Sequence, residues 1–203
     1  MSQSLRADLK VIADLVEPNS KVLDIGCGSG ELLAWLGQHK QVDGRGIELD
    51  QSSVNQAVQA GLSVIQGDVN ADLKAYPDKA YDYVILSQAL QAMQQPKPVL
   101  AELMRIGRRA IVSVPNFGHW KNRMYLGLKG KMPVTKTLTY TWYDTPNIHF
   151  CTISDFVELC ESMDIKIIHK LMVTHNGSPS RFRGKGSLLA NLFGEQGVFL
   201  LEQ

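Results

Sequence analysis

Short apolar runs alternate with amphipathic stretches along this chain. The run "KVLDI" at 21–25 is short and apolar, and "YDYVILS" at 81–87 alternates before it becomes continuously apolar, as buried strands do. The stretch 4–16 instead places an apolar residue at every third or fourth position, which is typical of a helix. The same reasoning predicts strands at 21–25, 44–49, 62–66, 81–87, 109–114, 165–173 and 197–203, and helices at 4–16, 29–38, 51–60, 98–106 and 154–163.

This order of strands and helices predicts an α/β protein. Helices between consecutive strands imply right-handed crossovers and a mostly parallel, seven-stranded sheet, doubly wound in the Rossmann-like manner. The last two predicted strands, 165–173 and 197–203, are expected to form an antiparallel edge. The segment 115–148 breaks the rhythm, because it is long and has poor periodicity. We therefore expect one domain over 1–203 with a cap-like insertion at about 115–148.

Composition and charge narrow the class of protein. Of the 203 residues, 44% are hydrophobic and 20% are charged, as in folded globular proteins, and the net charge of +1 demands no polyanionic partner. No apolar run approaches the roughly 20 residues that span a bilayer, and the N-terminus lacks the apolar region of a signal peptide. Cys27, Cys151 and Cys160 have no metal-ligand spacing. We expect reduced thiols, no metal site, no membrane association and a cytoplasmic location.

A glycine loop joins the first predicted strand to the helix after it. Gly26, Gly28 and Gly30 leave the backbone free of side chains where a ligand approaches in open α/β sheets, at the carboxyl ends of the strands. Glu48 follows about 20 residues on, at the end of the second strand, where a carboxylate accepts hydrogen bonds from both hydroxyls of a ribose. The loop and this acid together predict a nucleoside site.

The charge around the loop decides which nucleoside is expected. Asp24 precedes the glycines and Glu31 follows them. At an effective dielectric constant of about 20, one like-charge pair about 6 Å apart costs on the order of 3 kcal/mol, so a pyrophosphate is disfavoured here. S-adenosylmethionine (SAM) fits instead, because it carries a ribose, an ammonium and a sulfonium but no phosphate. Asp24 could also brace the loop, and Glu31 could serve only as an acid of the first helical turn.

Two further positions complete the predicted cofactor site. Asp68, just past the third strand in "QGDV", can accept from the exocyclic amine of adenine, or can be a turn residue. Ser87 ends the fourth strand beside the expected place of the methionine part, or is only a strand-end residue. Cys27 is interpreted as a small neutral spacer rather than a nucleophile. The predicted cofactor-binding residues are Asp24, Gly26, Cys27, Gly28, Gly30, Glu48, Leu49, Asp68, Val69 and Ser87.

These stretches resemble a known superfamily. "LDIGCGSG", "GIELD" and "QGDV" are similar to the glycine-loop, ribose-acid and adenine motifs of class I SAM-dependent methyltransferases, over roughly residues 20 to 175. More narrowly, "VPNFGHWKNR" and "YTWYDTPNIHFCTISDF" resemble the methionine biosynthesis protein W (MetW) family.

The resemblance carries expectations of its own. It implies the class I methyltransferase fold and binding of SAM or S-adenosyl-L-homocysteine. It further implies association with a homoserine O-acetyltransferase or O-succinyltransferase in methionine biosynthesis, and activation of that enzyme.

No catalytic base is evident from the sequence. Methyl transfer needs an aligned nucleophile and sometimes a base, but "SQALQAM" at 87–93 holds neither proline nor carboxylate, which argues against methylation of adenine in DNA or of glutamine. Substrate or partner candidates are His119, Trp120, Tyr140 and His149. His149 could instead only help to dock the next helix, since Thr152 and Asp155 form a capping-box pattern, and Tyr140 could simply pack the insertion.

The predicted insertion mixes basic and aromatic residues. Its cations, with Asp144 as the single acid, are Lys121, Arg123, Lys129, Lys131 and Lys136. Such a surface can be a solvated rim, a protein interface, a site for an acidic small substrate or a site for single-stranded nucleic acid, the last disfavoured by the near-neutral chain.

Three functions remain open at this point. They are a SAM-binding subunit that associates with a homoserine acyltransferase, an active methyltransferase on a small molecule, and an NAD-dependent enzyme. The acids around the loop disfavour the third.

Overall fold

The computed structural model describes residues 5–135, 138–174, 178–184 and 188–203. Its strands are β1 Lys21–Ile25, β2 Asp43–Glu48, β3 Ser63–Gln66, β4 Tyr81–Ser87, β5 Gly107–Pro115, β6 Lys166–Val173, β7 Pro179–Arg181 and β8 Gln196–Glu202. Its α-helices are α1 Ala7–Leu15, α2 Glu31–Lys40, α3 Gln51–Gln59, α4 Val69–Asp72, α5 Pro96–Ile106, α6 Trp120–Lys129, α7 Ile153–Ser162 and α8 Leu188–Phe193, with short 3-10 turns η1 Leu73–Ala75 and η2 Leu90–Ala92.

One mixed sheet runs through the described residues in the order β3-β2-β1-β4-β5-β8-β6-β7. The five strands from β3 to β5 pair in parallel. At the other edge, β8 pairs antiparallel with β5 and with β6, and β7 pairs antiparallel with β6. The predicted doubly wound, mostly parallel α/β fold with an antiparallel edge is confirmed.

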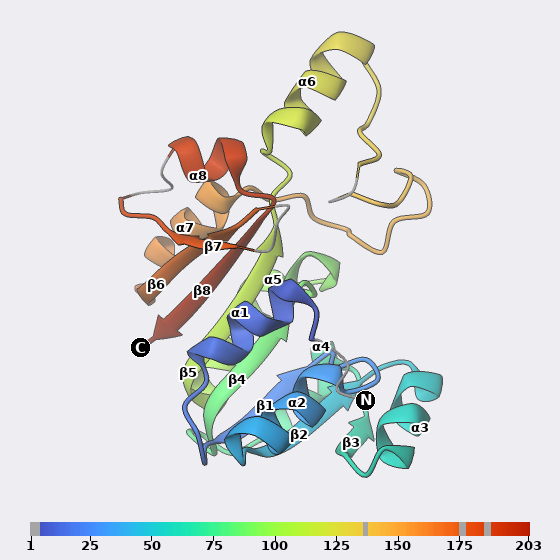
Figure 1. The fold of residues 1–203 in the computed structure, drawn as a ribbon, viewed down its shortest axis with the longest axis vertical. Helices are drawn as coiled ribbons and strands as arrows, with labels where there is room; N and C mark the ends of the chain where they lie inside the picture. Colours follow the sequence, from blue (N-terminus) through green and yellow to red (C-terminus); the bar gives the residue numbers. More distant parts are fainter. Residues whose placement is uncertain (1–4, 136–137, 175–177, 185–187) are drawn as a thin grey trace.

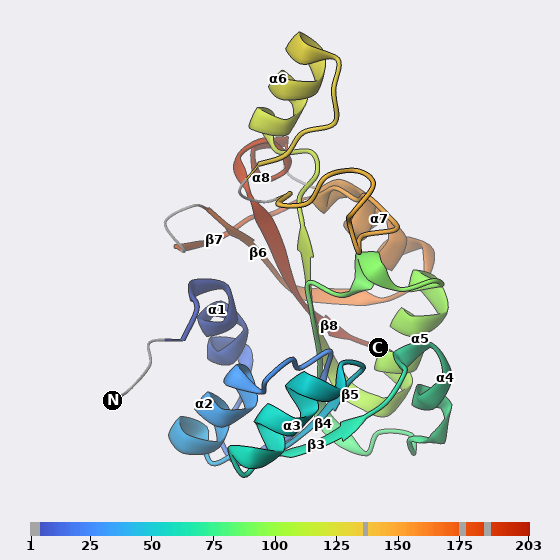
Figure 2. The same ribbon diagram turned by 90° about the vertical axis from the view of Figure 1, so that its right-hand side faces the viewer.

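Helices cover both faces of the sheet, as Figures 1 and 2 show. In Figure 2, α1, α2 and α3 lie on one side and α4, α5 and α7 on the other. Neighbouring residues of β1 follow this division, because Val22 packs with α1, α2 and α3 while Leu23 packs with α5 and α7. The strand is buried on both faces, which explains why its sequence is continuously apolar.

Two local predictions are corrected by the structure. Gly107 was expected to close α5, but its extended backbone (φ −95°, ψ 153°) already begins β5, so helix and strand join without a loop. The sheet of the described residues has eight strands rather than the predicted seven, because β7 has only three residues, Pro-Ser-Arg, which are exposed and gave no alternating pattern. This strand lies in the stretch 176–187, interpreted as a loop, of which 176–177 and 185–187 fall outside the described residues.

The predicted insertion contains a helix that the sequence analysis did not assign. This helix, α6, stands away from the sheet at the top of Figure 1 and is followed by an irregular segment that returns toward the sheet. Lys136, counted among the basic residues of the insertion, is outside the described part of the chain. Within that part, no helix is both long and apolar enough to cross a lipid bilayer.

Candidate functional site

The glycine loop lies at the carboxyl edge of the sheet, between β1 and α2. The parallel register pairs Ile25 with Ile47, so the loop begins beside the end of β2. The backbone N–H of Gly26 donates to the carbonyl of Ile47 (2.8 Å), and the N–H of Gly30 donates to the carbonyl of Cys27 (3.0 Å). These bonds fix a compact turn next to the ribose-binding acid predicted on β2.

Gly28 and Gly30 are glycine for different reasons. Both have positive φ, 56° and 82°, which other residues adopt only with strain. A side chain at Gly28 would meet no atom within 4 Å, so this part of the loop faces open space. A side chain at Gly30 would instead collide with Leu62. Gly28 therefore leaves room for a ligand, whereas Gly30 lets the start of α2 pack against the chain that leads into β3.

Glu48 joins the glycine loop to the turn after β2. Its Oε2 accepts from the N–H of Gly28 (2.8 Å) and its Oε1 from the N–H of Asp50 (3.0 Å). Its backbone carbonyl accepts from the N–H of Gly67 (3.0 Å), which brings the end of β3 to the same place. The next residue, Leu49, is 65% exposed and offers an apolar surface beside the carboxylate. The structure thus places three predicted regions around one acid.

Asp24, on β1, is a buried carboxylate. Its side chain is 3% exposed, and no hydrogen bond or ion pair reaches it from the described residues. Burial raises its pKa to about 7, with a further contribution from the nearby charge of Glu48. A cationic group at this position would favour the ionised form. The buried unpaired carboxylate and the open space at Gly28 fit a positively charged nucleoside such as SAM.

The second acid of the site is Glu48 and not Glu31, which corrects the charge argument made from sequence. Glu31 is exposed at the first turn of α2, and its Oε1 accepts from the backbone N–H of Arg6 (3.2 Å). It acts as a helix-start acid that ties the N-terminal segment to α2. Negative charge still surrounds the loop, but the coupled pair is Asp24 with Glu48.

Cys27 behaves as a spacer within the loop. Its Sγ lies so close to Gly46 of β2 that any side chain at Gly46 would overlap it. Burial, with the charges of Asp24 and Glu48, raises the pKa of the thiol to about 12. A thiol that stays protonated at neutral pH is a poor nucleophile.

Asp68, the residue predicted to bind adenine, lies at the start of α4. The Oδ1 of Asp68 accepts from the backbone N–H and the side-chain amide of Asn70 (2.9 Å each), which caps α4. The backbone N–H of Asp68 donates to Asp72 (2.7 Å), and Val69 is buried in the core. The turn role weighed from the sequence is therefore present, and an adenine contact by Asp68 stays a prediction.

Ser87 ends β4 next to the glycine loop. Its Oγ lies 3.2 Å from the Oγ of Ser113 on β5, which also accepts from the N–H of Gln88 (3.0 Å). Gln88 adopts a left-handed backbone (φ 51°), and the chain then turns so that Ala89 lies beside Gly26. The end of β4 and the glycine loop are thus neighbours, and a contact of Ser87 with the methionine part stays a prediction.

Gln91, in η2, was not singled out from the sequence. It is 5% exposed, its Nε2 donates to the carbonyl of Gln88 (2.7 Å), and its Oε1 has no hydrogen-bond partner among the described residues. Its backbone carbonyl accepts from the N–H groups of Ile148 and His149 (2.9 Å each). The available signal was a polar residue shortly after a continuously apolar parallel strand, where ligands bind.

The four substrate or partner candidates lie at the start of α6 and in the irregular segment that follows it, and the rings of His119 and Trp120 have centroids 6.0 Å apart. His149 is exposed and bound to the turn after β4 through its backbone. His119 is buried at the start of α6, where its Nδ1 accepts from the N–H of Lys121 (3.3 Å) and burial lowers the pKa of the ring. Trp120 is the first residue of α6, and Tyr140 is 52% exposed. His119 therefore serves as a helix cap.

Asn116 holds the base of the insertion. It is fully buried, and its Nδ2 donates to the carbonyls of Asn191 (2.8 Å) and Gly194 (2.7 Å). Its Oδ1 accepts from the N–H groups of Gly118 (3.0 Å) and Ile153 (3.4 Å). The stretch "VPNFGHWKNR" is thus a structural junction that joins β5, α6, α7 and α8.

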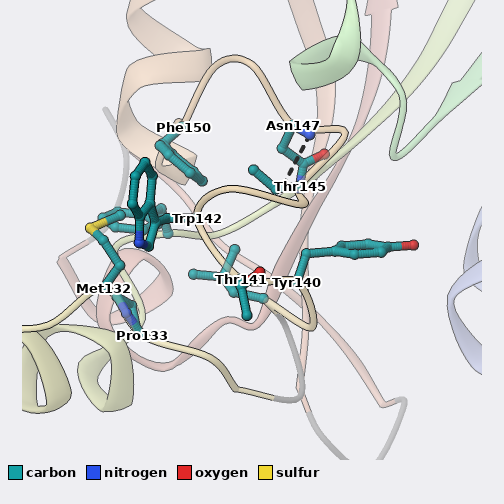
Figure 3. Close-up of a pocket in the computed structure, with 10 residues that line it drawn as sticks. Met132, Pro133, Tyr140, Thr141, Trp142, Thr145, Asn147 and Phe150 are labelled. Atoms are coloured by element: carbon teal, nitrogen blue, oxygen red, sulfur yellow. Dashed lines mark hydrogen bonds between the residues drawn. The ribbon is translucent and has the colours of Figure 1, made fainter.

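A small apolar pocket opens in the irregular segment after α6 (Figure 3). Figure 3 shows Met132, Pro133, Trp142 and Phe150 gathered on one side, while Tyr140 extends away from them. The rings of Phe117 and Phe150 pack with centroids 4.9 Å apart. Among the described residues, no group of three or more His, Cys, Asp or Glu side chains is arranged to hold a metal ion.

The N-terminal helix α1 also reaches the site, which the sequence did not reveal. The Nε2 of Gln88 donates to the Oδ2 of Asp8 (2.8 Å), and Asp8 pairs with Arg6 (2.9 Å). Together with the bond between Arg6 and Glu31, these contacts place the start of α1 beside the glycine loop and the end of β4.

Comparison with other sequences identifies the family. Residues 6–201 match the family described as methionine biosynthesis protein MetW. A bifunctional methionine biosynthesis protein MetXA/MetW from Rhodopirellula baltica is 34% identical over 173 residues. The match covers 81% of this chain but 28% of that protein, so the chain spans about a quarter of its relative.

Comparison with solved structures shows the fold. A SAM-dependent methyltransferase from Thermotoga maritima matches with a TM-score of 0.70 at 16% identity, over 97% of this chain and 87% of that one. A methyltransferase from Haloferax volcanii, solved in complex with the activator Trm112, matches with a TM-score of 0.68 at 16% identity, over 97% and 88%. With the match to the family from residue 6 to 201, these findings establish that the chain belongs to the methionine biosynthesis protein MetW family.

Proposed function

We propose that this chain binds SAM at the glycine loop and associates with a homoserine O-acyltransferase, which it activates. The observation that carries the proposal is a buried carboxylate at the glycine loop, close to a turn that lacks catalytic groups. Asp24 is buried next to Glu48 and has no hydrogen-bond or ion-pair partner among the residues that the structure describes, whereas the turn 87–93 contains no titratable side chain. Such a site suits the sensing of SAM better than chemistry on a second substrate.

Each residue at the loop would contact a different part of the cofactor. Glu48 would accept from the ribose hydroxyls, and Leu49 would lie against the adenine. Asp24 would face the cationic methionine part, near the end of β4, and Gly28 leaves the backbone accessible. When bound, SAM supplies an electrophilic methyl group and a positive charge. S-adenosyl-L-homocysteine would occupy the same residues without the sulfonium.

The partner is proposed from the family and from the fused relative. In the Rhodopirellula baltica protein, MetXA and MetW belong to one polypeptide, and we take MetXA to be the homoserine O-acyltransferase that the family resemblance implies. Two proteins fused in one organism are expected to act together when they are separate chains. The Haloferax volcanii structure shows that a protein of this fold can bind a partner chain. The three free thiols suit the reducing cytoplasm, where we place this function.

The test is an acylation assay with the acyltransferase of the same organism. Acyl transfer to homoserine is measured with increasing amounts of this chain, with and without SAM. We expect a saturable rise in rate that SAM alters. In Glu48→Ala we expect the rise to persist while the effect of SAM weakens, because the variant loses the ribose acceptor. An acylation rate that this chain leaves unchanged at saturating amounts would contradict the proposal.

A second candidate function is methyl transfer to a small molecule. It is favoured by the unpartnered side-chain oxygen of Gln91, which can accept from an amine of a substrate. The acceptor would have to bring its own nucleophile, since the turn after β4 provides no base. Transfer of a labelled methyl from SAM to cell extract, lost in Asp24→Ala, would favour this function over the first.

A further inference from the structure

The helix α6 has almost no packing of its own. Asn122 is the one buried residue among its ten. A ten-residue helix is marginal in water, and helices in proteins are normally stabilised by burying an apolar face. This helix is held at its base by His119, Asn122 and Arg123, and in Figure 1 it projects away from the sheet. Its outer part therefore has room for a partner.

The outward face of α6 is apolar. Trp120, Met124 and Leu128 recur at every fourth position and so share one face of the helix, on the side opposite Asn122. They are 40%, 51% and 77% exposed. Gly127 lies between them and leaves the face flat at that point. Helices that bind in the groove of another protein present anchors with this spacing.

Cations border this apolar face. Lys121 and Arg123 flank it on either side, whereas Lys129 lies on the same side of the helix as Asn122, with its Nζ 4.5 Å from the centre of the Tyr125 ring. Over 116–150 the sequence contains one acid, Asp144. The surface is therefore apolar in the middle and basic at its border, which is complementary to an apolar groove bordered by Asp and Glu.

The small apolar pocket of Figure 3 belongs to the same projecting part of the chain. It has a volume of about 20 Å³ and is lined by Phe117, Met132, Pro133, Trp142 and Phe150 among others. Trp142 is 71% exposed at its border. A concave apolar site of this size admits about one methyl-sized group, such as the end of an apolar side chain of a partner.

We propose that α6 and this pocket form the surface that docks the acyltransferase, an inference that rests on the function proposed above. The partner would present an acidic-bordered groove for α6 and one apolar side chain for the pocket. The segment 115–148 is long enough to supply the roughly 20 to 30 residues that one side of a stable interface uses. A second copy of this chain fits less well, because two such surfaces would bring like charges together.

The experiment measures the affinity of the full chain for the acyltransferase by calorimetry. In Met124→Glu/Leu128→Glu we expect the affinity to fall at least tenfold, because charged groups would enter the apolar contact. Val58→Glu, at an exposed position of α3, is the matched control and should change affinity less than twofold. In Lys121→Glu we expect a fall that high salt reduces, whereas Lys97→Glu on α5 should have no effect. Circular dichroism and SAM binding show that each variant remains folded.

The outcomes separate this inference from the proposed function. If the wild-type chain binds the acyltransferase and the α6 variants bind equally well, the docking surface is wrong while the proposed function stands. If the wild-type chain does not bind, both fail. If the variants instead abolish self-association or binding to anionic vesicles, and leave acyltransferase binding intact, the surface serves another partner and the inference is overturned.

Discussion

Two regions at the same end of the sheet carry unsatisfied groups of opposite kinds. At the glycine loop, charge is buried, because Asp24 lies in the interior with Glu48 beside it and, in the part of the chain that the structure describes, no ion-pair partner. In the insertion, apolar surface is exposed, because Trp120, Met124 and Leu128 face solvent. A small cationic ligand would relieve the first arrangement, and an apolar protein surface would relieve the second.

The comparison teaches how the two kinds of site differ in energy. A buried unpaired carboxylate destabilises the isolated fold and is partly neutralised by taking up a proton. Exposed apolar side chains cost little in the isolated chain, since they simply forgo burial. Mutations at the first region should therefore change stability and ligand binding together, whereas those at the outer part of the second should change association alone.

The largest effect is expected where the insertion joins the core. In Asn116→Ala, the carbonyls of Asn191 and Gly194 and the N–H of Gly118 lose their buried partner. We expect unfolding free energy to fall by roughly 3 to 5 kcal/mol, measured by urea denaturation. Asn55→Ala on the exposed face of α3 is the control and should stay within about 0.5 kcal/mol. A loss of unfolding free energy under about 1 kcal/mol would show that the hydrogen bonds of Asn116 contribute little to stability, and that the base of the insertion is not a structural junction.

The next effect concerns Asp24, whose raised pKa of about 7 determines how the stability of the protein changes with pH. The folded protein holds this proton more tightly than the unfolded chain, so the group lowers stability increasingly from about pH 4 to pH 7. Asp24→Asn should therefore be more stable than the wild type by on the order of 3 kcal/mol at pH 8, and equal to it below about pH 4. Thermal unfolding across this range measures the difference, with Asp14→Asn on α1 as the exposed control.

The same variant should bind SAM more weakly although it is more stable. Because the cation favours the ionised carboxyl, wild-type affinity should rise between pH 6 and pH 8, and in Asp24→Asn it should stay level. Equal stability of the two proteins at all pH values would show that the buried charge has a partner in solution.

The sequence predicted the strands and the glycine loop of the first region because their signals are local and periodic. Strands such as β1 and β4 are buried on both faces, so their apolar runs identify them, and the parallel register then brings Glu48 to the glycine loop. What could not be predicted is the direction in which each acidic side chain points. Asp24 and Glu31 flank the glycines in sequence, but the first turn of α2 points Glu31 toward Arg6, so the second acid of the site comes from β2.

In the second region the sequence analysis did not predict the helix α6, and the cause is physical. The expectation for a helix is an apolar face turned inward, yet in α6 the buried residue is the polar Asn122 and the apolar face is outside. Such a helix yields no signal of packing against its own sheet. The contacts of Gln91 with Ile148 and His149 were also hidden, because they join backbone groups far apart in sequence.

A smaller effect is expected on SAM affinity when Glu48 is changed conservatively. Glu48→Gln keeps one oxygen that can accept from Gly28 but loses the charge-assisted bonds to the ribose. We expect affinity measured by calorimetry to fall about 10-fold to 100-fold, or roughly 1.5 to 3 kcal/mol. Glu31→Gln, directly beside the loop in sequence, should change it less than threefold. The reverse ranking would restore Glu31 as the second acid of the site.

The smallest effect is the one that separates the two regions most sharply. Met124→Ser/Leu128→Ser removes apolar surface that already faces solvent, so unfolding free energy should change by less than about 0.5 kcal/mol, and SAM affinity should not change. Leu100→Ala in the buried face of α5 provides the contrast, with an expected loss of about 2 to 5 kcal/mol. Both are measured by urea denaturation of the isolated chain. A loss above about 1 kcal/mol in the serine variant would mean that the outer face of α6 is packed against its own chain in solution. The insertion would then have no exposed apolar face, and its contrast with the buried carboxylate of Asp24 would be wrong.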